Sequence, residues 1–149
     1  MRLLLLFFCY LVMAGFPVLA QEVTFPVSSL DIVTHEEKVH FTVEVATNDA
    51  QHARGLMWRK NLPKAHGMLF DFGHTQHADF WMKNTLIPLD MIFMNDHGTI
   101  TQVVENATPE STAIISSDTD VRAVLEVMGG SATRYHIAKG DKVLYSGFP

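Results

Sequence analysis

Apolar and polar residues alternate strictly over residues 39–45, and this alternation constrains the fold more than any other feature of the chain. The apolar positions are Val39, Phe41, Val43 and Val45. Successive side chains of a β-strand point to opposite faces of its sheet, so the pattern predicts a strand with one buried and one polar face. Strands of this half-polar kind are typical of antiparallel sheets.

Turn signals between apolar runs predict two hairpins. The polar run 35–38 joins an apolar stretch at 27–33 to the alternating strand. The segment 95–98 ends in glycine and joins apolar runs at 89–94 and 100–104. A glycine-containing turn between two apolar runs favours an antiparallel hairpin, because glycine accepts the positive φ angle that such turns require.

The middle of the chain predicts a third hairpin and two short helices. Apolar runs at 67–70 and 80–82 flank a polar segment, which we expect to be the hairpin loop. One helix is expected at 49–59, because Asn48 suits a helix start. The second is expected at 131–138, after a pair of glycines.

The remaining segments complete a mainly β domain. Residues 107–120 are rich in Thr, Ser and Asp and are expected to form a long surface loop. Residues 121–127 predict a buried strand, and 143–145 a last strand. Because hairpins dominate and no strand–helix–strand spacing repeats, the sequence predicts an antiparallel β sandwich or roll with two short helices.

The start of the chain has the composition of an export leader. Arg2 is followed by an uncharged apolar run over 3–19, and Ala20 fits the small-residue pattern before a cleavage site. We therefore expect a signal peptide at 1–20 and a single exported, periplasmic domain at 21–149. The alternative is an uncleaved segment that anchors the protein in a membrane.

Charge and cysteine content exclude several function classes. The chain has 11 Lys and Arg against 16 Asp and Glu, a net charge of −5, and no basic stripe that would serve a nucleic-acid partner. The single cysteine, Cys9, lies in the expected leader, so the exported domain would have no disulfide, no cysteine nucleophile and no thiolate metal site.

An aromatic and polar stretch at 80–90 is the strongest candidate site. An aromatic plate beside hydrogen-bonding groups is typical of a small-ligand pocket, although core packing is the competing interpretation of a tryptophan. Pro88 is expected to bend the chain so that Lys83 and Asp90 form an ion pair at the centre of the fold. The predicted ligand-binding residues are Trp81, Lys83, Asn84, Asp90, Arg54 and Glu126.

Three functions remain open from the residues. The favoured one is a non-catalytic domain that binds a small polar ligand or a cell-envelope partner at this patch. The second is a hydrolase acting on an envelope glycan, with Asp90 and Glu126 as acid and base and with Lys83 or Arg54 stabilising negative charge. That reaction requires both carboxylates to face one open cleft. The third is a purely structural or interaction domain, in which charged neighbours pair with the carboxylates.

Metal and cofactor chemistry receive little support. His74 and His77, with Asp71 or Asp79, would offer ligands for zinc or copper, but solvated loop histidines are the interpretation we favour. Neither a phosphate-binding glycine loop nor a dinucleotide fingerprint is present. We therefore predict no metal and no cofactor.

Several separated blocks resemble the domain-of-unknown-function 192 family. They are the run at 80–85 with Pro88-Leu89-Asp90, and the blocks at 54–57, 67–70, 124–126 and 140–141. The resemblance extends from the first strand to Val143. It implies one small domain of this family, and it implies no reaction.

Overall fold

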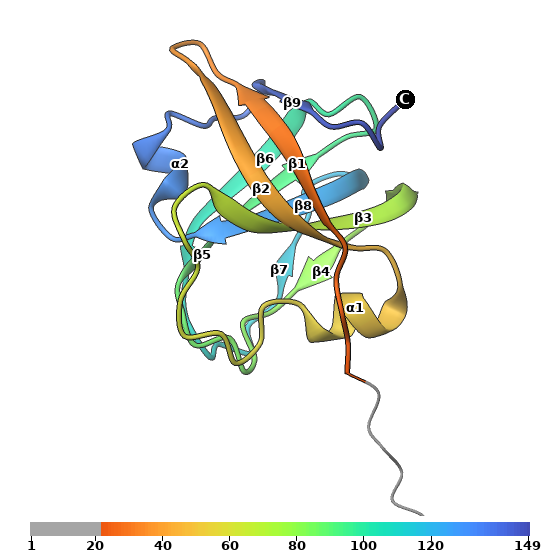
Figure 1. Cartoon of the computed structure of the whole chain (residues 1–149), viewed down its shortest axis with the longest axis vertical. Helices are drawn as coiled ribbons and strands as arrows, with labels where there is room; N and C mark the ends of the chain where they lie inside the picture. Colours follow the sequence, from red (N-terminus) through yellow and green to blue (C-terminus); the bar gives the residue numbers. More distant parts are fainter. Residues whose placement is uncertain (1–21) are drawn as a thin grey trace, which may run out of the picture.

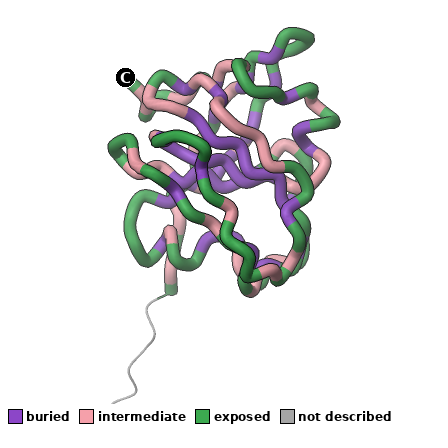
Figure 2. The backbone as a smooth tube through the Cα atoms, turned by 180° about the vertical axis from the view of Figure 1, so that it is seen from behind, coloured by how far each residue is buried: buried purple, intermediate pink, exposed green. Residues whose placement is uncertain are grey.

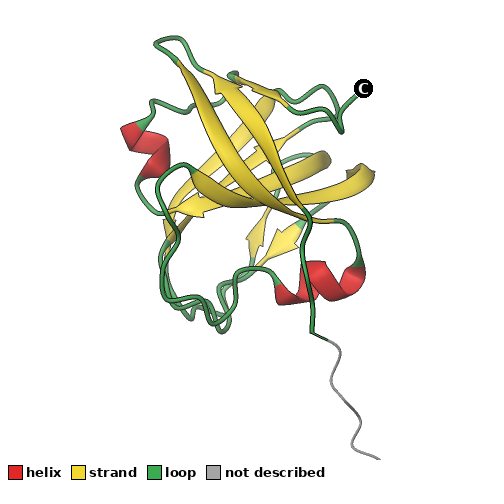
Figure 3. Cartoon of the chain, in the orientation of Figure 1, coloured by secondary structure: helices red, strands yellow, loops and turns green. Residues whose placement is uncertain are grey.

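A seven-stranded sheet forms the body of the protein in the computed structural model, which describes residues 22–149. The predicted leader at 1–20 lies outside the described residues. The strand order is β6-β5-β8-β3-β2-β1-β9, and a separate two-stranded sheet pairs β4 with β7 (Figures 1 and 3). The strands are β1 Val27–Val33, β2 Lys38–Ala46, β3 His66–Gln76, β4 Asp79–Phe80, β5 Leu89–Met94, β6 Ile100–Ala107, β7 Ile115–Ser116, β8 Val121–Met128 and β9 Lys142–Leu144.

The prediction of a mainly β fold with two short helices is confirmed, and so are two of the hairpins. β1 and β2 pair antiparallel across a turn in which the Thr34 N–H donates to the Glu37 carbonyl at 2.9 Å. β5 and β6 pair across the second predicted turn, where the Asn95 side chain accepts from the backbone N–H of His97 and Thr99. Local turn chemistry was therefore sufficient to specify both connections.

The third predicted hairpin is wrong. β3 continues to Gln76, through most of the expected loop, and it lies between β2 and β8. Its pairing with β2 is parallel, with α1 in the connection, so the sheet is not wholly antiparallel. β4 pairs instead with β7, a short strand inside the segment expected to be a surface loop. Side-chain pattern does not reveal which strands pair when both faces of a strand are buried.

Both helices are shorter than predicted. α1 spans Asp49–Arg54, and its N-terminus is capped as expected, because Asn48 Oδ1 accepts from the Gln51 N–H at 3.0 Å. Gly55 ends this helix at a φ of 45°, a conformation that glycine adopts without a Cβ clash. α2 spans only Ser131–Arg134. None of the described residues, 22–149, forms a helix long and apolar enough to cross a membrane.

The sheet curls so that its two edges approach, and it buries a core on each face. The inner core includes Phe41, Leu69, Ile92 and Leu125, and a bridge between Thr99 and Lys142 links the β6 and β9 edges. The outer core lies between β3, β8 and β5 and a second layer that contains α1 and the β4–β7 pair (Figures 1 and 2). The segments 67–70 of β3, 89–94 of β5 and 123–127 of β8 are therefore buried on both faces, whereas β2 keeps one more exposed face.

The close approach of β3 and β8 predicts a large penalty for a side chain at Gly67. A Cβ there would lie 2.5 Å from the Glu126 carbonyl oxygen, so Gly67→Ala must displace the ladder and should cost about 2 to 3 kcal/mol of unfolding free energy. Gly73→Ala is the control, because nothing lies near its Cβ position and its φ of 76° adds only backbone strain, about 1 kcal/mol. Urea unfolding measures both, and equal losses would contradict the close packing.

Candidate functional site

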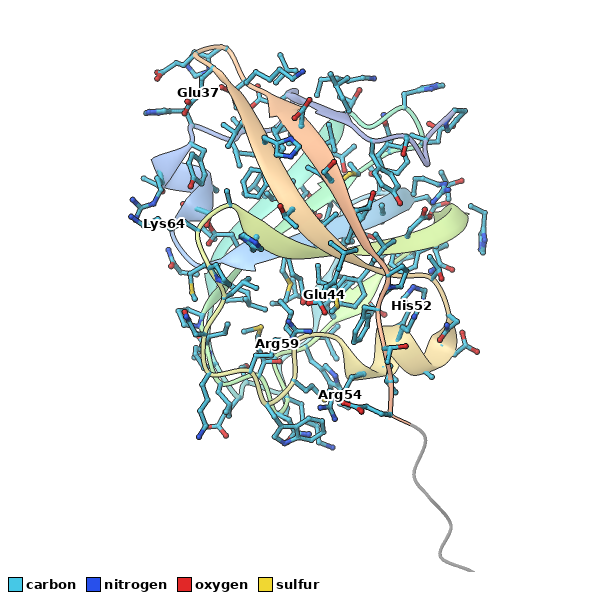
Figure 4. The ribbon with its side chains drawn as sticks, in the orientation of Figure 1. Glu37, Glu44, His52, Arg54, Arg59 and Lys64 are labelled. Carbon is cyan, nitrogen blue, oxygen red and sulfur yellow. The ribbon has the colours of Figure 1, made fainter. Side chains whose placement is uncertain are left out.

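A pocket of about 260 Å³ opens at the outer core, where α1 and the start of β4 face the sheet. Figure 4 labels two of its residues, His52 and Arg54, on α1 below the curled sheet. Its remaining walls come from β3, β8 and the segment that follows β4. The lining side chains with aromatic or polar groups are His52, Arg54, Phe70, Phe72, Gln76, His77, Asp79, Phe80, Trp81, Thr85 and Glu126.

Glu126 is the deepest ionisable group of this pocket. Strand pairing places it beside Met68 of β3 and Met91 of β5, both fully buried. The residue is 5% exposed, and its carboxyl has no hydrogen-bond or ion-pair partner within residues 22–149. Burial of this unpaired group raises the pKa of Glu126 to about 8. A protonated, proton-donating carboxyl therefore lies in the pocket near neutral pH.

Aromatic rings form the walls around this carboxyl. Phe80 packs edge to face against Phe70, with ring centroids 5.1 Å apart, and against Phe93 at 6.1 Å. His52 packs edge to face against Phe72 at 5.3 Å. Such T-shaped contacts are the preferred aromatic geometry, and they hold the walls in fixed positions. The pocket thus has a preformed apolar lining.

Trp81 lies at the mouth of the pocket and is 44% exposed. The Lys83 ammonium lies 5.1 Å from the centre of its ring, a cation–π distance. A second pair of the same kind is formed by the Arg54 guanidinium, 4.4 Å from the Trp58 ring. Core packing, the competing interpretation of Trp81, therefore does not describe this ring.

Asn84 connects the two loops that carry these tryptophans. Its carbonyl accepts from the Trp58 N–H at 2.8 Å, and its side-chain nitrogen lies 3.8 Å from the Met57 sulfur. The residue has a φ of 58°, a left-handed conformation that asparagine tolerates better than most residues. The structure thus gives Asn84 a backbone role beside the pocket mouth.

Asp90 is separated from the pocket, and the predicted Lys83–Asp90 ion pair is wrong. Asp90 is fully buried, and its carboxylate accepts from the backbone N–H groups of Asn106 at 2.8 Å, Gly130 at 3.1 Å and Ala132 at 2.8 Å. Strand alternation explains the difference, because Asp90 points inward while its neighbours in β5 point to the outer core. This carboxylate ties α2 to the sheet.

The two carboxylates considered for hydrolysis lie on opposite faces of the sheet. Asp90 is paired with Val127, and the adjacent Met91 is paired with Glu126. Residues directly opposite in an antiparallel ladder share a face, and adjacent residues in one strand do not. Asp90 and Glu126 therefore do not face one cleft, and the acid–base pair of the glycan-hydrolase hypothesis is not formed.

The candidate metal residues also take separate positions. His74 lies in β3, while His77 Nε2 is 3.4 Å from Asp79. Asp71 forms an ion pair with Arg122 across the β3–β8 ladder. No group of metal-ligating side chains gathers anywhere in the described residues, 22–149.

Three predicted residues, Arg54, Trp81 and Glu126, line the pocket, and sequence reasoning missed most of the others. Phe70 and Phe72 carried a usable signal, because they alternate along β3 and share its outer face. His52 and Thr85 carried no such signal, since they reach the pocket through pairings between distant segments. A pocket built from separate segments needs the tertiary structure to be found.

The family match agrees with this architecture. Residues 31–145 match the model of the domain-of-unknown-function 192 family, DUF192, which is described as Uncharacterized ACR. The match covers most of the chain. The protein belongs to this family, as the sequence blocks suggested.

Two solved structures are similar to the whole domain. One is a proposed transcription regulator from Sinorhizobium meliloti 1021, with 41% identity, a TM-score of 0.82 and coverage of 85% of this chain and 99% of that chain. The other is a protein of unknown function from Novosphingobium aromaticivorans DSM 12444, with 33% identity, a TM-score of 0.79 and coverage of 89% and 91%. No curated protein matches the chain.

Asp90 and Lys83 should contribute to stability independently. Asp90→Ala leaves three backbone donors without their acceptor, so we expect a loss on the order of 4 kcal/mol of unfolding free energy. Lys83→Ala removes an exposed side chain and should change it by about 0.5 kcal/mol or less. Urea unfolding of the double variant should give the sum. A coupling energy above about 1 kcal/mol would show that the two residues interact.

Glu126 should make the fold less stable as the pH rises. The folded protein keeps the Glu126 proton up to about pH 8, whereas the unfolded chain loses it near the ordinary value of 4.5. The unfolded state binds fewer protons between these values, so the unfolding free energy should fall across this window, by a few kcal/mol as an order of magnitude, and then level off.

Glu126→Gln should remove this component of the pH dependence. We expect the variant to match the original protein below about pH 4.5 and to exceed its stability above about pH 8. Glu110→Gln is the control, because Glu110 is exposed and its loss should leave the slope intact. Chemical unfolding over this pH range measures the unfolding free energy of each protein. Parallel curves of unfolding free energy against pH for the original protein and Glu126→Gln would contradict an unpaired buried carboxyl.

Proposed function

We propose that this domain is a non-catalytic binder of a small ligand, which occupies the pocket between α1, β3, β4 and β8. The observation that carries the proposal is the combination of fixed aromatic walls with one buried, unpaired carboxyl. Pockets for small molecules are typically apolar and contain few, well-placed polar groups. A carboxyl without a partner is costly to bury, so a ligand that pairs with it would recover that cost.

The predicted ligand residues divide into three roles in this proposal. Glu126 would contact the polar group of the ligand, while Trp81 would cover the ligand at the mouth. Arg54 and Lys83 stack on the two exposed tryptophans and would set the charge of the rim. Asp90 has no place in the binding site, since its carboxylate is occupied by backbone N–H groups on the other face.

Export of the domain is part of the proposal. The apolar run at 3–19 and Ala20 support delivery to the periplasm, where the ligand would be a small polar compound or a component of the cell envelope. An uncleaved leader would place the same pocket near the membrane surface. The net charge of −5 gives no support for carrying the regulator description of the Sinorhizobium meliloti protein over to a nucleic-acid function here.

Ligand binding can be tested with the purified full chain and a set of small aromatic and aliphatic compounds, charged and neutral. NMR chemical-shift changes should gather at pocket residues such as Phe72, Phe80 and Trp81. Trp81→Ala should weaken the binding of such a compound about 5-fold, because stacking on an aromatic ring contributes on the order of 1 kcal/mol.

Trp58→Ala is the matched control for this experiment. Trp58 is also exposed and also carries a stacked cation, but it does not line the pocket. We expect this variant to bind as the original protein does. Shift changes that avoid the pocket, or equal losses from both tryptophan variants, would refute the proposed site.

A further inference from the structure

We propose that the ligand of this pocket carries an ammonium group, which pairs with Glu126 between the aromatic walls. This inference rests on the proposed function and names the chemical class of its ligand. Three features of the pocket support it: the missing partner of Glu126, the aromatic rings of the lining, and the distribution of charge along the lining.

The first feature is the missing partner. Glu126 is more than nine-tenths buried, it lines the pocket, and no donor within residues 22–149 reaches its carboxyl. Asp90, the buried carboxylate on the opposite face, differs in this respect, because three backbone N–H groups donate to it. A partner for the Glu126 carboxyl would therefore have to come from a ligand. A cation is the strongest complement of a desolvated carboxylate.

The second feature is the aromatic lining. Phe70, Phe72, Phe80 and Trp81 all border the cavity. The face of an aromatic ring attracts a cation, and the attraction grows when water is excluded. At the mouth, Trp81 already has the Lys83 ammonium 5.1 Å from its ring centre. The aromatic walls and the Glu126 carboxyl therefore both favour a positively charged ligand.

The third feature is the charge along the lining. The ionisable side chains that border the cavity are His52, Arg54, His77, Asp79 and Glu126. The Arg54 guanidinium stacks on Trp58, outside the cavity lining, and His77 lies 3.4 Å from Asp79. His52 Nε2 is 3.0 Å from the Ala46 carbonyl oxygen, so this nitrogen donates to the backbone. Among the described residues no cationic side chain forms an ion pair with Glu126, and Arg54 and Lys83 are each stacked on a tryptophan ring.

Binding of an ammonium group should be coupled to proton release. With the pocket empty, burial keeps most of the Glu126 carboxyl protonated near neutral pH, since its pKa lies at about 8. An ammonium ligand binds the ionised form, so its affinity should rise as pH increases. A neutral ligand that accepts a hydrogen bond from the protonated carboxyl should show the opposite trend. The direction of the pH effect thus distinguishes the two ligand classes.

Benzylammonium and benzyl alcohol provide a matched pair of probes. They have nearly the same shape, and the amine stays charged between about pH 6 and pH 8, as alkylamines do. The ionised fraction of Glu126 rises about 50-fold over that interval for a pKa of about 8. Isothermal titration calorimetry on the purified full chain should therefore give up to about 50-fold tighter benzylammonium binding at the higher pH, with release of protons. Benzyl alcohol should instead bind more weakly at the higher pH than at the lower pH.

Glu126→Gln and Glu110→Gln complete the test. Glu126→Gln should lose the pH dependence of benzylammonium binding while still binding benzyl alcohol, whereas Glu110→Gln, with the same change in net charge, should behave as the original protein does. His52 and His77, which also line the cavity, are present in both variants, so the comparison isolates the effect of Glu126.

Each other outcome has a defined meaning. If benzyl alcohol binds in the pocket but benzylammonium gains no affinity at the higher pH, the site exists but the ammonium class is wrong. If benzylammonium binds equally well to Glu126→Gln, the carboxyl does not select the ligand and the inference fails. If neither probe shifts the NMR signals of pocket residues, both the ammonium class and the proposed function are refuted.

Discussion

The position of β8 between β3 and β5 is the constraint on which the rest of the structure depends. The paired segments 67–70, 89–94 and 123–127 of these strands are buried on both faces, so each residue there lies against either the inner core of the curled sheet or the outer core beneath α1. A change of one residue in register would exchange the two faces. The close contact of Gly67 with the β8 backbone helps to fix that register.

The same register gives two buried carboxylates opposite environments. Asp90 points inward and is saturated by backbone N–H groups, so it joins α2 to the sheet. Glu126 lies on the neighbouring strand, points outward and has no partner in the described residues. A buried carboxylate that is saturated by backbone donors stabilises the fold, whereas an unpaired carboxyl that borders a cavity is a candidate functional group.

The outer layer forms the mouth of the pocket. α1 is short because Gly55 ends it early, and the chain then runs to the loop that carries Trp58. Asn84 holds this loop against the segment that carries Trp81. The pocket mouth is therefore built by two loops that share backbone contacts, and its floor is built by the most buried strands. Rigid floors and looser rims are typical of sites that admit small molecules.

The sequence by itself determined the mainly β class, several of the elements and the family. Period-two alternation identified β2, turn residues identified the β1–β2 and β5–β6 hairpins, Asn48 marked the start of α1, and separated blocks indicated DUF192. Such signals are local, and one stretch of chain carries each of them. Trp81, Arg54 and Glu126, which line the pocket, could be selected as candidate site residues because their types are unusual in their surroundings.

Only the tertiary structure decided which of these residues meet. The sequence placed Lys83 with Asp90, and Asp90 with Glu126, because all three lie near apolar segments. The pairing of β5 with β8 separated Asp90 from Glu126, since it set the two carboxyl groups on opposite faces of the sheet. The parallel β2–β3 contact and the β4–β7 pair were likewise undetermined by sequence. The alternation of β2 shows which face is buried but not which strand lies beside it, and β4 and β7 have two residues each, too few to show a period.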